Sequence, residues 1–519
     1  MGEPKMEESI FVPVSPIHSS LQNQIIASII CSLGSFAFGC QLGWLSPVID
    51  DLQRPTGGPL EVPMTEAELS WAGGLLCFGG VLGLPIFNVV AKSKGRKPSA
   101  YVVGIPIAIA AVIKIYAESS LWMLVSQLIL GIGGAGAISL PPLYVSEICE
   151  PRGRGALSSL IVVQYSFGVF TSYVIGALVS YEVHTAVQLA SPLLFLLAFW
   201  FMPETPLFRL KKGEEEAAAR AVAWLRKLPL NGVAVRTELL GLARQLRGAE
   251  PMDITYEPTK EDLTREMEYL ISRLPQDHDA IHKRPVEFDD SYTKKQSAWK
   301  ALISSRAAVR GLIICIALIV AQTIMGLAAI AVYASLVFEA VHLKVSSDVC
   351  SIVYSITLVI GCGVGSVTMD YAGRRFLQIS SCFIVCIGEL ILGIFFHASQ
   401  NEYAPDWLSW VALISLVVSV IAYNCGAATV VFVLLAEYFA AEVRDLANNI
   451  TMYVMWVSAL LLMQLFSPSI TAFGIANVFF FFSIASFISG VLSFIFVPET
   501  KGKTQDEVIE ILETGIYYR

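Results

Sequence analysis

Apolar residues in this chain gather in long runs instead of alternating with polar residues. Each run has about the 17–25 residues that a helix needs to cross a bilayer core of about 30 Å. The pattern predicts an all-α membrane protein with twelve transmembrane helices. The runs are 24–47, 70–91, 99–117, 121–145, 156–180, 185–202, 311–337, 349–369, 376–397, 408–436, 447–466 and 474–497.

A polar stretch of about a hundred residues separates the first six runs from the last six. Within it, Glu214 to Leu228 starts acidic and ends basic, as a helix macrodipole favours, and Thr259 opens a capping-box pattern before a second amphipathic segment. We therefore expect short helices in this linker. The predicted parts are a tail (1–23), a six-helix bundle (24–202), the linker (203–310), a second six-helix bundle (311–497) and a C-terminal tail (498–519).

Composition and charge agree with a membrane protein. The chain is 55% hydrophobic and only 15% charged, whereas a soluble protein has about 25% charged residues. Its net charge of −8 argues against a nucleic-acid partner. Short loops at Lys92–Lys97, Arg152–Arg154 and Arg374–Arg375 are basic. Basic short loops stay in the cytoplasm, so we expect both termini and the linker on that side of the plasma membrane.

Three motifs of the first half recur in the second half, in the same order and at a nearly constant offset. Gly95-Arg-Lys97 recurs as Gly373-Arg-Arg375. Glu147 with Arg154 recurs as Glu437 with Arg444, and a Pro-Glu-Thr segment follows the last helix of each half. The repeats predict two duplicated, pseudo-symmetric six-helix halves, an architecture typical of secondary transporters with a site between the halves.

With these motifs, and with Tyr144-Val-Ser-Glu147, Gln322…Gly326 and Gly43-Trp44-Leu-Ser-Pro47, the chain resembles the sugar porters of the major facilitator superfamily. The resemblance covers about residues 25 to 510 and is closest to insect facilitated trehalose transporter-like members. It implies a transporter with the major facilitator fold that works as a monomer by alternating access, not an enzyme.

The resemblance also implies an inner gate of charged residues at the cytoplasmic ends of the helices. Two positions depart from the family pattern: Lys92 stands where the second half has an acid, and Gln127 replaces an arginine of the fourth helix. The second-half network is therefore expected to be the more complete one. The implied gate residues are Glu147, Arg154, Arg96, Asp370, Arg374, Arg375, Glu437 and Arg444.

At the positions that the resemblance implies for the sugar site, the chain keeps Gln322 and Trp456. It places Asn424 where the glucose facilitators have a glutamate, and Phe432 where they have tryptophan. Gln164 and Asn424 are nearby polar groups that partly substitute for lost ones. We therefore expect a site less polar than that of a typical sugar porter. The other family positions with polar groups hold Val162, Thr323, Ala328, Leu358 and Met455.

Other chemistries have little support in the sequence. The six histidines lie in tails, loops or span ends, so no buried acid–base centre, cofactor or metal site is expected. Glu389 in the ninth run is an exception, because an acid inside a membrane is either functional or neutralised in a structural role. Gln41 stands where proton-linked members carry a carboxylate, which predicts uncoupled transport.

The expected function is facilitated diffusion of a small neutral solute, a sugar such as trehalose or a hexose. Two alternatives remain open at this point. One is a diverged family member that carries a less polar solute. The other is a sugar-sensor-like receptor that binds solute without transporting it and signals through the linker.

Overall fold

The computed structural model describes residues 20–230, 232–247, 298–332, 347–400, 406–503 and 505–515. Twelve helical spans within these ranges are long and apolar enough to cross a membrane, which confirms the predicted fold class. The first six are α1 with α2 (Gln22–Gly43, Leu45–Gln53), α3 (Glu66–Ser93), α4 (Arg96–Ile115), α5 (Ser120–Ile148), α6 (Pro151–Leu178) and α7 with α8 (Tyr181–Gln188, Ala190–Trp200).

The second six spans follow the linker. They are α14 (Arg306–Ile324), α17 (Ser347–Ala372), α18 (Arg374–Gln400), α19 with α20 (Asp406–Cys425, Ala427–Glu437), α21 (Ala441–Phe473) and α22 (Ile475–Phe496). Each predicted run overlaps one span. The largest difference is at the seventh run, predicted over 311–337, whose span ends at Ile324. The first span continues to Gln53, and the eleventh runs to Phe473 through Pro468.

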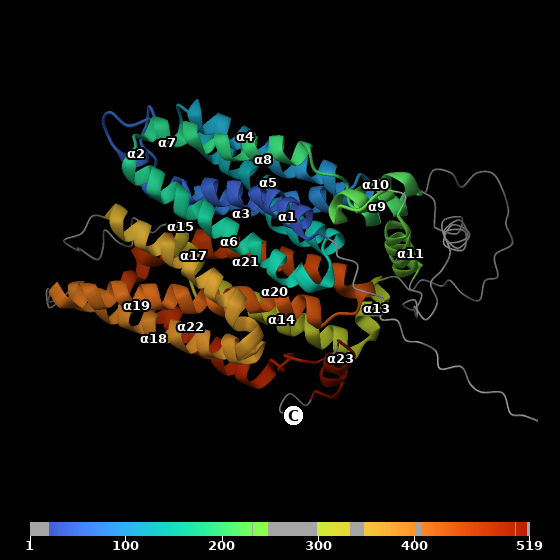
Figure 1. Cartoon of the computed structure of the whole chain (residues 1–519). Coiled ribbons are helices and arrows are strands. Elements are labelled where there is room, and N and C mark those ends of the chain that lie inside the picture. The colour runs from blue at the N-terminus through green and yellow to red at the C-terminus, as the bar shows by residue number, and fades with distance from the viewer. Residues whose placement is uncertain are drawn as a thin grey trace, which may run out of the picture. The chain divides into compact units, whose positions relative to one another are not determined.

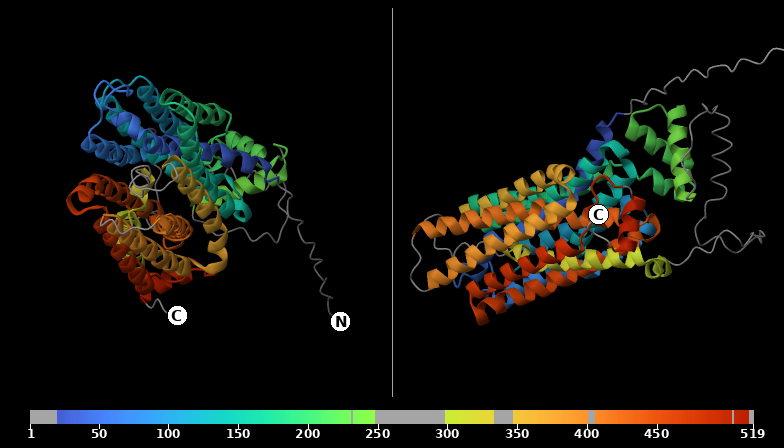
Figure 2. Two further views of the ribbon diagram at one scale, coloured as in Figure 1. Left: turned by 90° about the vertical axis from the view of Figure 1, so that its left-hand side faces the viewer. Right: turned by 90° about the horizontal axis from the view of Figure 1, so that it is seen from below.

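The described chain divides into two compact units, which are taken separately. The larger, here called the membrane unit, comprises 28–146, 154–202 and 286–519. In it the helices up to α8 form one group and α14 to α22 form another (Figure 1, blue to green and yellow to red), and the view along the helices separates the two groups again (Figure 2). These groups are the two predicted halves.

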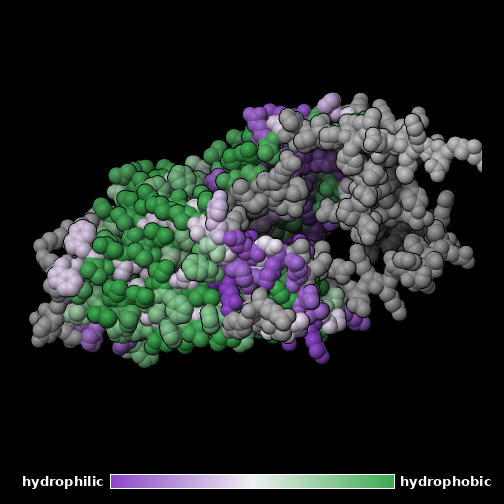
Figure 3. Space-filling model, turned by 60° about the horizontal axis from the view of Figure 1, so that its bottom comes forward, coloured by the Kyte–Doolittle hydropathy of each residue, from purple (hydrophilic) through white to green (hydrophobic). Residues whose placement is uncertain are grey.

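Exposed apolar side chains cover the outside of the spanning helices. Leu197 on α8 and Phe487 on α22 are more than half exposed, and hydrophobic residues dominate the visible face of these helices (Figure 3). A soluble protein rarely exposes an apolar surface of this extent, so the membrane unit presents the surface that a lipid bilayer requires.

The smaller unit comprises 1–27, 147–153 and 203–285. It contains α9 (Pro206–Lys211), α10 (Glu215–Arg226) and α11 (Val233–Arg247), whose apolar faces share a core that includes Leu210, Val222 and Leu239. The helix predicted over 214–228 is confirmed as α10. The second predicted segment, from Thr259, lies outside the described residues.

A buried arginine holds this smaller unit together. Arg226 is 7% exposed and pairs with Glu238 at 2.6 Å and with Glu150 at 3.3 Å. Its third nitrogen donates to the backbone oxygen of Ile148 at 2.9 Å. A planar guanidinium suits several oxygen acceptors at once, so Arg226 joins α10 and α11 to the short segment 147–153.

Candidate functional site

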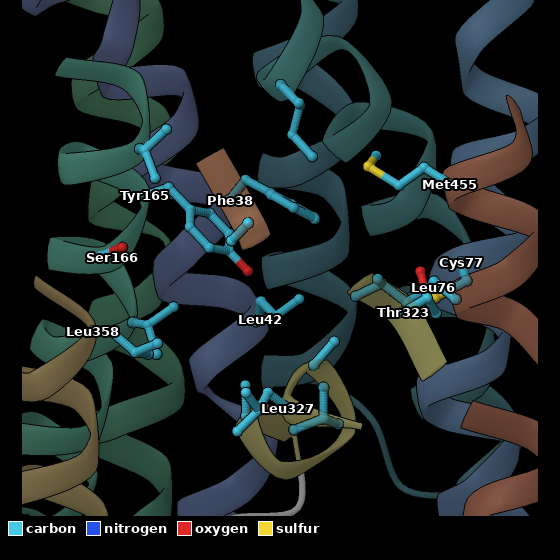
Figure 4. Close-up of a pocket in the computed structure, with 18 of the residues that line it drawn as sticks. Phe38, Leu42, Leu76, Cys77, Tyr165, Ser166, Thr323, Leu327, Leu358 and Met455 are labelled. Carbon is cyan, nitrogen blue, oxygen red and sulfur yellow. The ribbon is translucent and has the colours of Figure 1, made fainter. Parts of the chain in front are cut away.

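A cavity of about 280 Å³ lies inside the membrane unit, between its two halves. The first half contributes residues such as Phe38 and Tyr165, and the second contributes residues such as Thr323 and Met455 (Figure 4). Among the described residues, its lining includes no Asp, Glu, Lys, Arg or His. The arrangement suits an uncharged solute, because nothing in the wall would compensate a buried charge.

A break in the seventh span shapes one side of the cavity. α14 ends at Ile324, and α15 (Leu327–Val332) begins after Gly326. Gly326 has φ +76°, and a Cβ there would lie 2.4 Å from the ring of Phe482. Only glycine fits such a position without strain. The break places Gln322 and Ala328, on either side of it, in the cavity wall.

The tenth span is broken in a similar way at Gly426, between α19 and α20. A Cβ at Gly426 would lie 2.3 Å from the backbone oxygen of Leu377, so the helices approach closely there. Asn424 precedes the break and Phe432 follows it, and both line the cavity. Broken helices near a midplane site are a common feature of transporters.

Trp456 of α21 is 5% exposed and lies against the first half of the protein. Its ring occupies the space left by Gly80 of α3, where a Cβ would come within 2.3 Å of it. The ring also packs edge-on against Phe38, with centroids 6.4 Å apart. Trp456 therefore forms part of an aromatic wall shared by both halves.

The structure brings most residues of the predicted site together. Gln322, Thr323, Asn424, Phe432 and Trp456 all line the cavity, whereas Gln164, a half-buried described residue of α6, does not. The positions expected to have lost polar groups lie in the same wall and make it largely apolar. These are Val162, Ala328, Leu358 and Met455.

Two predicted polar groups are already engaged with the protein itself. Asn424 donates to the backbone oxygen of Val420 at 2.8 Å, and its side-chain oxygen accepts from the Cys362 thiol at 3.5 Å. The Thr323 hydroxyl bonds to the Ile319 backbone oxygen at 2.9 Å and contacts the Ser458 hydroxyl at 3.2 Å. A solute would have to displace these bonds in order to use either group.

The sequence analysis did not place Gln127 in the cavity. This residue of α5 lines the cavity and is 3% exposed, and its side-chain oxygen has no hydrogen-bond partner among the described residues. The same holds for the side-chain oxygen of Gln322. The sequence shows a glutamine where the family has an arginine, but that position was expected to belong to the inner gate.

A buried lysine in the first half was also missed. Lys114 of α4 is 1% exposed, donates to the side-chain oxygen of Gln41 at 2.9 Å, and lies 4.3 Å from the ring centroid of Trp44. Gln41 in turn donates to the backbone oxygen of Gln188 at 3.2 Å. Through these contacts Lys114 of α4 and Gln188 of α7 are joined to Gln41 of α1, and Lys114 also to Trp44, which follows α1.

His184 lies near the start of the sixth span, as expected, but it is buried there among polar side chains, which the sequence did not predict. It is 1% exposed, and its Nε2 lies 2.9 Å from the Gln188 side-chain nitrogen and 3.1 Å from the Ser172 hydroxyl. The sixth span begins at Tyr181 instead of residue 185. That difference puts His184 inside the helix bundle, although not in the cavity wall.

Some of the implied gate residues form contacts within the second half. Arg374 pairs with Glu437 at 3.1 Å. Arg444 donates to the backbone oxygen of Phe439 at 3.1 Å and to the Gln505 side chain at 3.4 Å. Gln505 opens α23 (Gln505–Thr514), so Arg444 links the start of α21 to the C-terminal segment.

The Pro-Glu-Thr segment of the second half stabilises the start of α18. Glu499 accepts from the backbone nitrogens of Arg374 and Arg375 at 3.1 Å, at the start of α18. A carboxylate is favourable at a helix N-terminus. Gly373 precedes this start with φ +87°, and a Cβ there would lie 2.6 Å from the Glu499 carboxylate. Two of the repeated motifs therefore form one junction.

Arg96 and Glu147 each make contacts within their own unit, and two gate side chains are outside the described residues. Arg96 is 8% exposed and donates to the Ala91 backbone oxygen at 2.7 Å. Glu147, in the smaller unit, accepts from the Thr205 hydroxyl at 2.6 Å. The side chains of Arg154 and Asp370 are outside the described residues.

Glu389 lies within the helix packing of the second half. Its side chain is fully buried on α18, and one oxygen accepts from the Ser486 hydroxyl at 2.7 Å. Glu389 is not among the described residues that line the cavity. A fully buried acid with a neutral partner is stable when it is protonated, which fits the structural alternative.

Comparisons with known proteins agree with this architecture. The family model "Sugar (and other) transporter" matches residues 27–267 and 255–512. The human solute carrier family 2, facilitated glucose transporter member 6 is 25% identical over 96% of this chain and 93% of its own length. The facilitated trehalose transporter Tret1 of Polypedilum vanderplanki is 25% identical over 98% of this chain and 91% of its own.

The Tret1 protein of Drosophila yakuba is 23% identical, and the match spans only 53% of its length. Among solved structures, the major facilitator superfamily proton:xylose symporter XylE bound to 6-bromo-6-deoxy-D-glucose matches with a TM-score of 0.69 and 20% identity. It covers 95% of this chain and 100% of that structure. The chain therefore belongs to the sugar (and other) transporter family and has the major facilitator fold.

Proposed function

We propose that this protein is a facilitative transporter that moves a sugar across the plasma membrane by alternating access. The observation that carries the proposal is the uncharged cavity of about 280 Å³ between the two halves. Such a cavity suits a neutral solute, and its described lining has no Asp, Glu or His side chain whose protonation a transport cycle would couple to the solute. The relatives named for glucose and trehalose transport support a hexose or trehalose as the solute.

The contacts between the halves suit a cycle in which they separate and re-form. Ser70 donates to the Met463 backbone oxygen at 3.2 Å, and Asn88 donates to Asn449 at 3.0 Å. Both bonds join α3 to α21 without formal charge. A net hydrogen bond of this kind contributes about 0.5–1.5 kcal/mol, so a few of them hold the halves together without locking them.

Within this proposal, Gln322 and Trp456 bind the solute, with Thr323, Asn424 and Phe432 in the same wall and Gln164 outside it. The gate is built from the second-half residues around Arg374, Glu437 and Arg444. The basic short loops support a cytoplasmic location for both termini and the linker. One chain contains a complete cavity, which supports function as a monomer in the bilayer.

The test is uptake of radiolabelled hexoses and trehalose into vesicles reconstituted with the purified protein. We expect saturable flux that Gln322→Ala abolishes. Gln378→Ala is the matched control, because Gln378 is a buried glutamine of α18 that is not among the lining residues. Absence of flux for every sugar would contradict the proposal. Sugar binding without flux would instead favour a receptor.

A further inference from the structure

Most polar side chains in the cavity wall already form hydrogen bonds with other groups of the protein. The Ser35 hydroxyl donates to the Ala137 backbone oxygen at 2.7 Å, and the Ser166 hydroxyl contacts the Cys362 thiol at 3.2 Å. Thr323 and Asn424 are engaged as described above. These groups already have hydrogen-bond partners within the protein, so they leave few donors or acceptors for a solute.

Two glutamines differ from this pattern. The side-chain oxygens of Gln127 and Gln322 are buried and have no hydrogen-bond partner among the described residues. Gln127 lines the cavity from α5 in the first half, and Gln322 lines it from α14 in the second. A buried acceptor without a partner is unfavourable, so a solute hydroxyl that donates to either oxygen is favoured at these positions.

Much of the remaining wall offers no hydrogen bond to a hydroxyl group. Phe38, Leu42, Leu76, Leu327, Leu358 and Met455 surround the cavity (Figure 4). A hydroxyl placed against such side chains loses its bonds to water and gains none.

We propose that Gln127 is a second solute-binding residue, and that with Gln322 it selects a solute with fewer hydroxyl groups than glucose. One solute hydroxyl donates to each glutamine oxygen, one from each half, and an apolar face of the ring lies against the aliphatic wall. Deoxy and O-methyl hexoses have this chemistry. The inference rests on the proposed transport function and specifies its substrate class.

Selectivity is tested first, with the unmodified protein. Transport and solute-induced thermal stabilisation are compared for glucose, trehalose, each monodeoxyglucose and each mono-O-methylglucose. We expect at least one analogue to exceed both glucose and trehalose in kcat/KM by about tenfold or more, the effect of one to three buried hydroxyls that lack partners. Preference for glucose or trehalose over every analogue would overturn the substrate class.

The role of Gln127 is tested with Gln127→Leu, which removes the amide and keeps the side-chain bulk. We expect the KM for the preferred analogue to rise about tenfold or more and its stabilising effect to disappear. The unfolding temperature without solute is expected to stay unchanged or to rise, because an unpartnered buried oxygen is removed. An unchanged KM would overturn the role of Gln127.

Gln378→Leu is the matched control. Gln378 is 1% exposed and its side-chain oxygen also has no partner among the described residues, but the residue does not line the cavity. Its replacement should leave the KM unchanged. If Gln127→Leu does not fold, Gln127→Asn, which shortens the amide arm, carries the same expectation. If an analogue binds but is not transported, the site is supported and the transport function is refuted. If no analogue binds and none is transported, both the site and the transport function are overturned.

Discussion

The side-chain nitrogen of Lys114 lies 2.9 Å from the side-chain oxygen of Gln41, inside the first half of the membrane unit. The lysine is 1% exposed, and it also lies against the ring of Trp44. A buried amine left without an acceptor costs about 1–3 kcal/mol. Gln41 therefore stabilises the first half by accepting a hydrogen bond from a buried amine.

This relationship predicts a measurable coupling between the two residues. Gln41→Leu should lower the free energy of unfolding by about 1–3 kcal/mol, because the buried amine of Lys114 loses its only side-chain hydrogen-bond acceptor among the described residues. Adding Lys114→Met should recover part of that loss, since the unsatisfied buried amine is then gone. Denaturant unfolding of both single variants and the double variant in detergent measures the coupling. Strictly additive effects would refute it.

The ion pair between Arg374 and Glu437 predicts a modest effect on the gate. Its side chains are 16% and 27% exposed, and partly exposed pairs contribute about 0–1 kcal/mol. Arg374→Ala should therefore change the ratio of inward-facing to outward-facing protein by about fivefold at most. Accessibility of an engineered cysteine to a membrane-impermeant reagent measures this ratio. The charge-swapped variant Arg374→Glu with Glu437→Arg should restore it, and a swap without recovery would contradict the pairing.

The junction of the two second-half motifs predicts a strong dependence on Gly373. Gly373→Ala places a side chain at φ +87°, at a cost of about 1–2 kcal/mol, and crowds the Glu499 carboxylate. The unfolding temperature should fall. Gly363→Ala is the matched control, because a Cβ on that helical glycine of α17 would meet no neighbouring side chain or helix within 4 Å. It should gain stability, by about 0.8–1.0 kcal/mol. Equal losses in both variants would argue against the junction.

The apolar wall predicts that glucose uptake can be raised by restoring amides. Ala328→Asn together with Thr323→Gln adds donors and acceptors on both sides of the Gly326 break. Each new net hydrogen bond contributes about 0.5–1.5 kcal/mol, so two bonds should increase kcat/KM for glucose by about fivefold to a hundredfold. Uptake at several glucose concentrations measures the change. A double variant that folds and shows no gain would mean that the solute does not reach this wall.

The sequence predicted the spans well because helices that cross a membrane need long apolar runs, and such runs can be read without knowing what they pack against. Most of the predicted site also came together, since Gln322, Asn424 and Trp456 lie at corresponding depths in their helices. Lys114 was missed because a single cation near the end of a span hardly changes the apolar pattern.

The hydrogen-bond partners could not be predicted in this way. Whether Asn424 faces the solute or its own helix depends on the break at Gly426 and on the neighbouring thiol of Cys362. Gln127 illustrates the same limit, because a glutamine in a span has no pattern that separates a cavity wall from a helix interface. Side-chain direction is set by packing between helices that are far apart in the sequence.

The central claim is uncoupled transport of a neutral sugar, and the final level of solute in sealed vesicles tests it most directly. With an imposed proton gradient, the internal concentration of labelled sugar should reach the external concentration and stop there, because no Asp, Glu, Lys, Arg or His lines the described cavity. A protonophore should leave that level unchanged. Accumulation above the external concentration that the protonophore abolishes would contradict the account.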